Sequence, residues 1–140
     1  MRYILICVFL FMTSGLHAQV EKYYGKFFTD GSRKKNEFAL TYDDGPGAAT
    51  GDLLKLLDKY QVKATFFLLG ISVEKYPDIA AQTARAGHLI GSHTWAHKLY
   101  IKVARSPGYE KVLETELEKA AEIISRTAGK RPVFLRMPNG

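Results

Sequence analysis

The sequence predicts an α/β fold in which parallel strands alternate with helices. Short apolar runs, typical of buried strands, alternate with longer segments whose apolar residues recur at helical spacing. Strand-helix alternation of this kind favours parallel strands joined by right-handed crossovers, in either a doubly wound sheet or a (β/α) barrel. Three polar clusters each follow an apolar run, and function collects at the carboxyl ends of such strands. We favour the barrel because closure brings clusters from the first, third and fourth strands to one point.

The first half of the pattern contains two strands and one helix. Residues 37–42 form a short apolar run, which we interpret as a buried strand that ends at two aspartates. A helix follows, capped by Thr50 or Asp52. Its apolar stripe comprises Leu53, Leu54, Leu56, Leu57 and Tyr60. Residues 64–69 form the second strand, closed by Gly70.

The second half repeats the pattern. Residues 74–86 form a helix that tolerates Pro77 near its start and stops at Gly87. Residues 88–92 are a short third strand. The next helix spans residues 109–127 and is ended by Gly129, and residues 132–135 form the fourth strand.

The first residues have the features of a signal peptide. Arg2 supplies a positive charge, residues 3–12 are an unbroken apolar run, and residues 13–18 are small and mixed. The run is shorter than the roughly 20 residues of a transmembrane helix. We therefore expect cleavage after Ala18, no stable membrane insertion afterwards, and an exported protein that is periplasmic, on the cell surface or secreted.

The remaining chain is predicted to be a lead-in segment at residues 19–35 and one domain at residues 36–140. The net charge of +6 is modest for 140 residues. The main basic cluster, Arg33-Lys34-Lys35, is typical of a solvated turn. We therefore predict no nucleic-acid partner, and we expect a monomer.

The first polar cluster is Thr41-Tyr42-Asp43-Asp44-Gly45-Pro46. Consecutive side chains on an extended chain point in opposite directions, so Asp43 and Asp44 are not expected to do the same job. One can face a metal while the other faces a substrate. The alternative is structural, because Asp-Gly and Gly-Pro form turns that either aspartate could cap.

The second cluster carries His93 and His97, four residues apart. On a helical turn this spacing places two imidazoles on one side, a geometry that suits Zn²⁺. With one carboxylate of the aspartate pair they form a ligand set that leaves positions open for water and substrate. Zn²⁺ lowers the pKa of a bound water toward about 7 and polarises a carbonyl. The same set also suits the Fe²⁺ of an oxygenase, but those ligands usually sit on an all-β scaffold.

At these residues the sequence resembles the polysaccharide deacetylase family of carbohydrate esterases (carbohydrate esterase family 4, the NodB-like domain). The family motif T-F-D-D-G-P corresponds to residues 41–46, H-[ST]-x-x-H to residues 93–97, and R-x-P-[YF]-G to residues 136–140. The resemblance runs from about Phe38 to the last residue. It implies a (β/α) barrel of the polysaccharide deacetylase type, of which this chain would be an incomplete, amino-terminal part.

The resemblance also implies a role for each matching residue. Asp43 would be the general base, and Arg136 would pair with it. The metal, zinc or another divalent ion such as Co²⁺, would be held by Asp44, His93 and His97. The backbone N–H of Asn139 would stabilise the oxyanion.

Three further residues carry weaker expectations. Thr94 would brace the histidine loop through its hydroxyl. Trp95 would either stack on a sugar ring or pack within the loop. His88 precedes its strand and is expected to be structural.

The implied reaction is metal-dependent hydrolysis of N-acetyl groups on a glycan such as peptidoglycan, chitin or an exopolysaccharide. Asn139 replaces the aromatic of the third motif and removes an apolar wall beside the acetyl group. The family continues with two more motifs, so we expect weak or no activity from this chain alone. A glycan-binding remnant without catalysis and an O-acetyl esterase of the same family are the alternatives.

Overall fold

The computed structural model describes residues 31, 34 and 37–139. The chain divides into two units, residues 1–38 and 39–140, and the helices and strands described here lie in the second. The predicted signal peptide lies outside the described residues, as does the lead-in segment apart from Gly31 and Lys34. Within the described part, none of the helices has the length and apolar character needed to cross a membrane.

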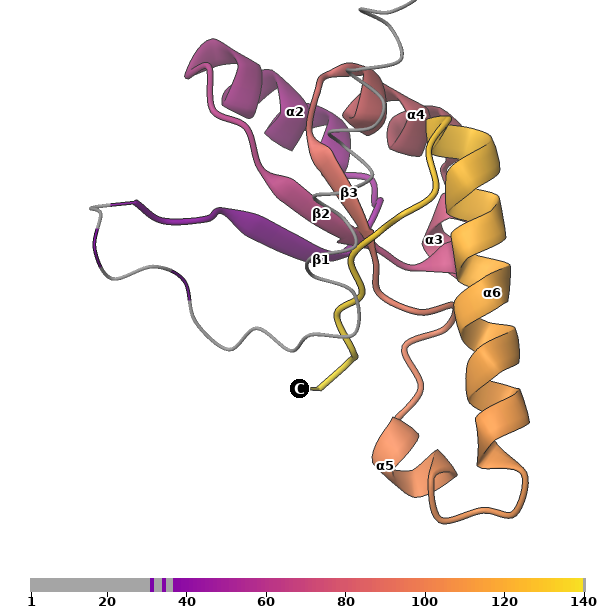
Figure 1. Ribbon diagram of the computed structural model, residues 1–140. Helices are drawn as coiled ribbons and strands as arrows, with labels where there is room; N and C mark the ends of the chain where they lie inside the picture. Colours follow the sequence, from indigo (N-terminus) through magenta and orange to yellow (C-terminus); the bar gives the residue numbers. More distant parts are fainter. Residues whose placement is uncertain (1–30, 32–33, 35–36, 140) are drawn as a thin grey trace, which may run out of the picture. The chain divides into compact units, whose positions relative to one another are not determined.

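A parallel sheet of three strands forms the centre of the second unit (Figure 1). Its strands are β1 (Thr41–Gly45), β2 (Thr65–Leu68) and β3 (Leu89–Ser92), hydrogen-bonded in that order. Leu135 extends the sheet beyond β3 by a single parallel bridge to Ser92. Over the described residues the strand order thus follows the chain, without the reversal of a doubly wound sheet. This partial α/β fold agrees with the barrel prediction.

Helices cover the sheet and pack on one another. They are α2 (Thr50–Lys59), α3 (Gly70–Lys75), α4 (Pro77–Arg85), α5 (Tyr100–Val103) and α6 (Tyr109–Ala128). The long helix α6 packs against α3, α4 and β3, as Figure 1 shows. The core between helices and sheet is apolar and includes Leu54, Leu57, Phe66, Leu68, Val73, Ala80, Ala120, Ile123 and Ile124.

Several predicted boundaries were wrong, each for a local reason. The helix predicted over 74–86 is two helices, because Tyr76 takes an extended φ of −130° before Pro77. The fourth strand predicted over 132–135 is reduced to the bridge at Leu135. The short helix α5 was not predicted.

Two predicted helix ends are confirmed, and one predicted N-cap was wrong. Gly87 and Gly129 follow α4 and α6 with φ of +78° and +75°, the left-handed conformation that glycine adopts at no steric cost, and this confirms both stops. The cap predicted at Thr50 or Asp52 was wrong, because Ala49 is the N-cap residue. The Thr50 hydroxyl instead accepts the Gly47 N–H at 2.9 Å. The stripe of α2 is also narrower than predicted, since Leu56 is 51% exposed and Tyr60 is 65% exposed.

Candidate active site

An irregularity in β1 separates the two aspartates. The strand spans Thr41–Gly45 and runs through Asp43 and Asp44, whereas the sequence predicted a strand over residues 37–42 that ends at the two aspartates. Tyr42 pairs with Phe66 and Gly45 with Leu68, so three steps along β1 match two along β2. Asp44 has a φ of 67°. An extra residue of this kind re-aims the neighbouring side chains, and Asp43 and Asp44 contact different partners.

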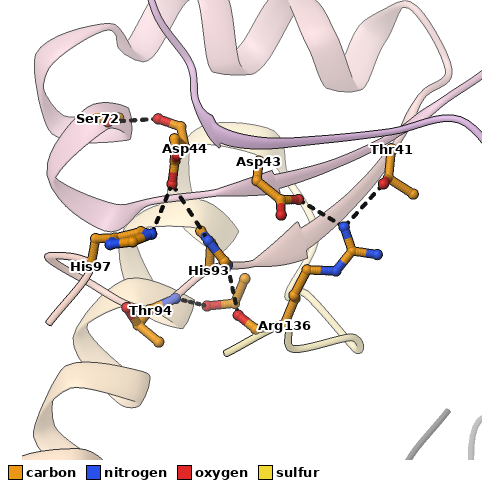
Figure 2. Close-up of polar contacts among 9 residues, drawn as sticks. Thr41, Asp43, Asp44, Ser72, His93, Thr94, His97 and Arg136 are labelled. Carbon is orange, nitrogen blue, oxygen red and sulfur yellow. Dashed lines mark hydrogen bonds and ion pairs between the residues drawn. The ribbon is translucent and has the colours of Figure 1, made fainter. Parts of the chain in front are cut away.

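Asp44 faces the two histidines (Figure 2). Its Oδ1 lies 3.4 Å from the Nε2 of His93 and 3.3 Å from the Nε2 of His97. One ligand atom from each of the three residues can be chosen so that all lie within 4.8 Å of one another. The Asp44 side chain is 64% exposed, whereas His93 is 3% exposed. The cluster therefore has a buried side and an open side.

The tautomer of His93 follows from one hydrogen bond. Its Nδ1 lies 2.7 Å from the carbonyl oxygen of Arg136. A carbonyl oxygen can only accept, so Nδ1 carries the proton and donates it. The Nε2 that faces Asp44 is then unprotonated in the neutral ring and available as a ligand.

The histidine cluster is a loop and not the helical turn that the spacing suggested. Thr94 and His97 have φ values of 71° and 53°, which an α-helix does not contain. The two imidazoles still meet, with ring centroids 5.2 Å apart at 66°. The loop is held at its start by α3, where the Gly70 N–H donates to the Thr94 carbonyl at 3.0 Å.

Asp43 is held by Arg136, away from the two histidines, as Figure 2 shows. The Nη1 of Arg136 donates to Asp43 Oδ1 at 2.9 Å and to Thr41 Oγ1 at 3.0 Å. The guanidinium Cζ lies 4.1 Å from the centroid of the Phe67 ring, a cation–π contact. Together these contacts fix the arginine over the end of the sheet. Its backbone carbonyl orients His93, so both halves of the site depend on this residue.

The remaining predicted site residues are placed as follows. The Thr94 side chain is fully buried next to the Tyr100 hydroxyl, and the Thr94 carbonyl accepts the Gly70 N–H, so the bracing role of its hydroxyl stays a prediction. Trp95 is 9% exposed and belongs to the core cluster, with the Lys119 ammonium 3.6 Å from its ring centroid. The structure thus favours packing over sugar stacking for Trp95. Asn139 is exposed with a φ of 65°.

His88 lies away from this cluster and has a structural setting. It is 8% exposed, and its Nδ1 accepts the Ala64 N–H at 3.2 Å. Burial lowers the pKa of the His88 imidazole, and the nearby Lys63 ammonium lowers it further. The neutral ring is therefore favoured, in agreement with the structural expectation.

Sequence reasoning gave no role to Glu116. This residue of α6 is 8% exposed, and its carboxylate accepts from Lys98 at 2.7 Å and from Tyr100 at 3.2 Å. The available signal was an acidic residue three positions after Leu113 and four before Ala120, inside an apolar stripe.

The family model for polysaccharide deacetylase matches residues 30–140. The chain belongs to the polysaccharide deacetylase family. This confirms the resemblance carried by the three motifs, and it connects the gathered side chains to a family of hydrolases.

Individual relatives within the polysaccharide deacetylase family agree. Over 122 residues the chain is 43% identical to a peptidoglycan-N-acetylglucosamine deacetylase of Bacillus cereus, a match covering 86% of this chain and 42% of the relative. The solved structure of the Bc1960 peptidoglycan N-acetylglucosamine deacetylase is 42% identical with a TM-score of 0.67, covering 76% of this chain and 48% of that one. A family 4 acetyl xylan esterase from Clostridium thermocellum, solved with a cobalt ion, is 34% identical with a TM-score of 0.64, covering 72% and 48%. The chain spans less than half the length of these relatives.

Proposed function

We propose that this chain supplies the metal ligands and the general base of a metal-dependent polysaccharide N-deacetylase. One observation carries the proposal. Asp44, His93 and His97 present their ligand atoms to one another, while the adjacent Asp43 is held apart by Arg136. A metal-dependent hydrolase needs both a ligand set and a separate base.

The donor set fits Zn²⁺ or Co²⁺. Two imidazole nitrogens, which are borderline donors, and one harder carboxylate oxygen suit these ions, and three protein ligands leave positions open. The Nδ1 bond to the Arg136 carbonyl places the proton of the neutral His93 ring on Nδ1, so that its Nε2 can act as the ligand. A divalent ion held by Asp44, His93 and His97 would polarise the acetyl carbonyl and lower the pKa of water.

The chain's own groups then have distinct tasks. The Asp43 carboxylate accepts the proton of the attacking water, and the Arg136 guanidinium keeps that carboxylate in place. The backbone N–H of Asn139 donates to the oxyanion that forms from the acetyl carbonyl. The buried face of His93 keeps the ligand side rigid while the exposed side of Asp44 admits substrate.

An N-acetylated glycan of the cell wall is the proposed substrate, with peptidoglycan first. The support is the 43% identity to a peptidoglycan-N-acetylglucosamine deacetylase. Such a substrate lies outside the cytoplasm, which agrees with the export expected from the first 18 residues.

An O-acetyl esterase is the second candidate. It is favoured by the 34% identity to an acetyl xylan esterase. Both reactions place a water on an acetyl carbonyl, and they differ in whether an amine or an alcohol leaves. Acetylated xylan and N-acetylchito-oligosaccharides, assayed side by side, separate them.

The test is acetate release from these substrates, measured with zinc and with a chelator. Because the chain spans less than half of its relatives, the 140-residue chain and a version extended downstream of Gly140 are both assayed. Asp43→Asn should abolish acetate release and keep metal binding, whereas Asp44→Asn should abolish both. Asp52→Asn, which alters an exposed acid of α2, is the control.

Two outcomes would contradict the proposal. One is acetate release that survives the chelator and Asp43→Asn. The other is glycan binding without acetate release by either version, unaffected by Asp43→Asn, which would support a non-catalytic glycan-binding protein.

A further inference from the structure

Glu116 is the one acidic residue that is buried among the described residues. Burial of a carboxylate is costly unless the charge is paired and hydrogen-bonded. Both oxygens of Glu116 have partners: Oε1 accepts from the Lys98 ammonium at 2.7 Å, and Oε2 accepts from the Tyr100 hydroxyl at 3.2 Å. The carboxylate thus joins α6 to the segment that follows the histidine loop.

The two partners of Glu116 lie directly after the histidine loop in the chain. Lys98 directly follows His97, and Tyr100 begins the short helix α5 two residues later. His97 itself has a φ of 53°, a conformation that is unfavourable for a residue with a side chain and persists only where the surroundings enforce it.

The two histidines are oriented by different means. His93 is buried and its Nδ1 donates to the Arg136 carbonyl. The His97 side chain is 36% exposed, and within the described residues the polar contact of its imidazole is with Asp44 alone. Apart from this contact and the edge contact with the His93 ring, the direction of the His97 ring depends on its backbone, which Glu116 holds after the loop through Lys98 and Tyr100.

The start of the loop has its own anchors. The N–H groups of Gly70 and Ile71 donate to the carbonyls of Thr94 and Trp95, each at 3.0 Å. Lys119, one turn along α6 from Glu116, covers the Trp95 ring. Between these anchors and Glu116, the loop is fixed at both ends.

We propose that Glu116 is a positioning residue for His97, acting through Lys98 and Tyr100 to fix the ligand for the metal. This inference rests on the proposed metal site. It assigns the buried carboxylate a purpose beyond packing, because a packing role alone would be met by an apolar residue at the same place on the stripe.

The experiment measures metal binding in the 140-residue chain with Glu116→Gln, which keeps the volume and removes the charge. Co²⁺ affinity, the Co²⁺ absorption spectrum and the melting temperature without metal are recorded for each protein. We expect a loss of about 10-fold or more in Co²⁺ affinity, the usual effect of removing a group that orients a ligand. Tyr100→Phe removes one hydroxyl from the same carboxylate and should act in the same direction. Glu114→Gln, on an exposed position of α6, is the matched control.

A second readout distinguishes positioning from general stability. The ring signals of isotope-labelled histidines are compared in the metal-free proteins, with His97 assigned by His97→Ala. Glu116→Gln should shift or broaden the His97 signals and leave those of His93 in place.

The outcomes separate the two proposals. If the unaltered chain binds no Co²⁺, the proposed function fails and this inference fails with it. If the unaltered chain binds Co²⁺ and both Glu116→Gln and Tyr100→Phe bind it equally well, only the role of Glu116 is overturned. That role is likewise overturned if the variants melt earlier but show unchanged Co²⁺ affinity and unchanged His97 signals.

Discussion

At the scale of single residues, the site depends on neighbours that have different surroundings. Asp43 and Asp44 are adjacent carboxylates, yet one contacts a guanidinium and the other contacts two imidazoles. The alternation of an extended chain predicts this divergence, and the register shift in β1 accompanies it. Arg136 also has two separate contacts, because its side chain donates to Asp43 and its carbonyl accepts from His93.

That division makes Arg136→Met informative. The variant loses the guanidinium beside Asp43 but keeps the carbonyl that accepts the His93 Nδ1–H. We expect acetate release to fall by about 100-fold or more, the scale of a misplaced general base. Metal affinity, measured by calorimetry, should stay close to that of the unaltered protein.

Arg131→Met is the matched control, because it removes a guanidinium from an exposed pair with Glu118. A parallel loss of metal affinity in Arg136→Met, absent from Arg131→Met, would mean that the side chain also supports the ligands.

His88 predicts a pH dependence of stability. Because burial lowers its pKa in the folded protein, the unfolded chain binds more protons once the pH falls below about 6.5. The contribution of His88 to the free energy of unfolding is therefore fully present above about pH 6.5, and it is lost as the pH falls from there through the folded-state pKa. Urea unfolding at several pH values should show this loss.

His88→Asn should reduce that loss, because the amide oxygen can accept the Ala64 N–H without titrating. Equal loss of stability between pH 7 and pH 5 in both proteins would show that other groups cause it.

At the scale of elements, close contact between β2 and β3 supports the arginine. A Cβ on Gly91 would lie 2.6 Å from the Phe67 ring and 3.2 Å from the Phe134 carbonyl oxygen. The same ring lies beneath the Arg136 guanidinium. Because Gly91 has no side chain, the Phe67 ring can pack directly on β3, where it supports the Arg136 guanidinium.

Gly91→Ala should destabilise the protein by about 1–3 kcal/mol, the usual cost of overpacking. Urea unfolding measures it. Gly51→Ala is the control: its Cβ meets nothing within 4 Å, and it should stabilise α2 by about 0.5 kcal/mol. Equal effects at the two glycines would contradict the packing argument.

Apolar periodicity predicted β2, α2 and α6 well, because each buries one face or a whole strand in the core. It failed at α3, α5 and β1. There the backbone is decided by a proline, by loop contacts and by the register shift, which leave no periodic signal.

For the site, the residue types predicted a ligand set of His93, His97 and one carboxylate of the aspartate pair, and the family resemblance implied Asp44, but neither indicated the local geometry. Four-residue spacing indicated a helical turn, whereas positive φ values at Thr94 and His97 produce a loop. Glu116 was missed because its partners Lys98 and Tyr100 are 18 and 16 residues away.

At the scale of the whole molecule, the candidate site joins parts of the sheet that are not neighbours. Asp44 belongs to β1, and the histidines follow β3 on the far side of β2. A metal bound by all three would connect the two outer strands and favour the folded chain over the unfolded one.

Zinc should therefore raise the melting temperature, and a chelator should reverse the rise. With free zinc at 100 times its dissociation constant, the gain is about 2.7 kcal/mol. Differential scanning calorimetry measures the shift, and Asp44→Asn should remove it. An equal shift in Asp44→Asn would place zinc elsewhere on the chain.

The carbonyl of Arg136 has one further consequence in the proposed site. The main-chain carbonyl of Arg136 sets the direction of His93, and the Arg136 side chain sets the direction of Asp43. A displacement of the main chain at this residue therefore disturbs both together, and linkage makes the effect reciprocal. Occupation of the metal site should restrain the base, and a glycan held beside the base should tighten the hold on the metal.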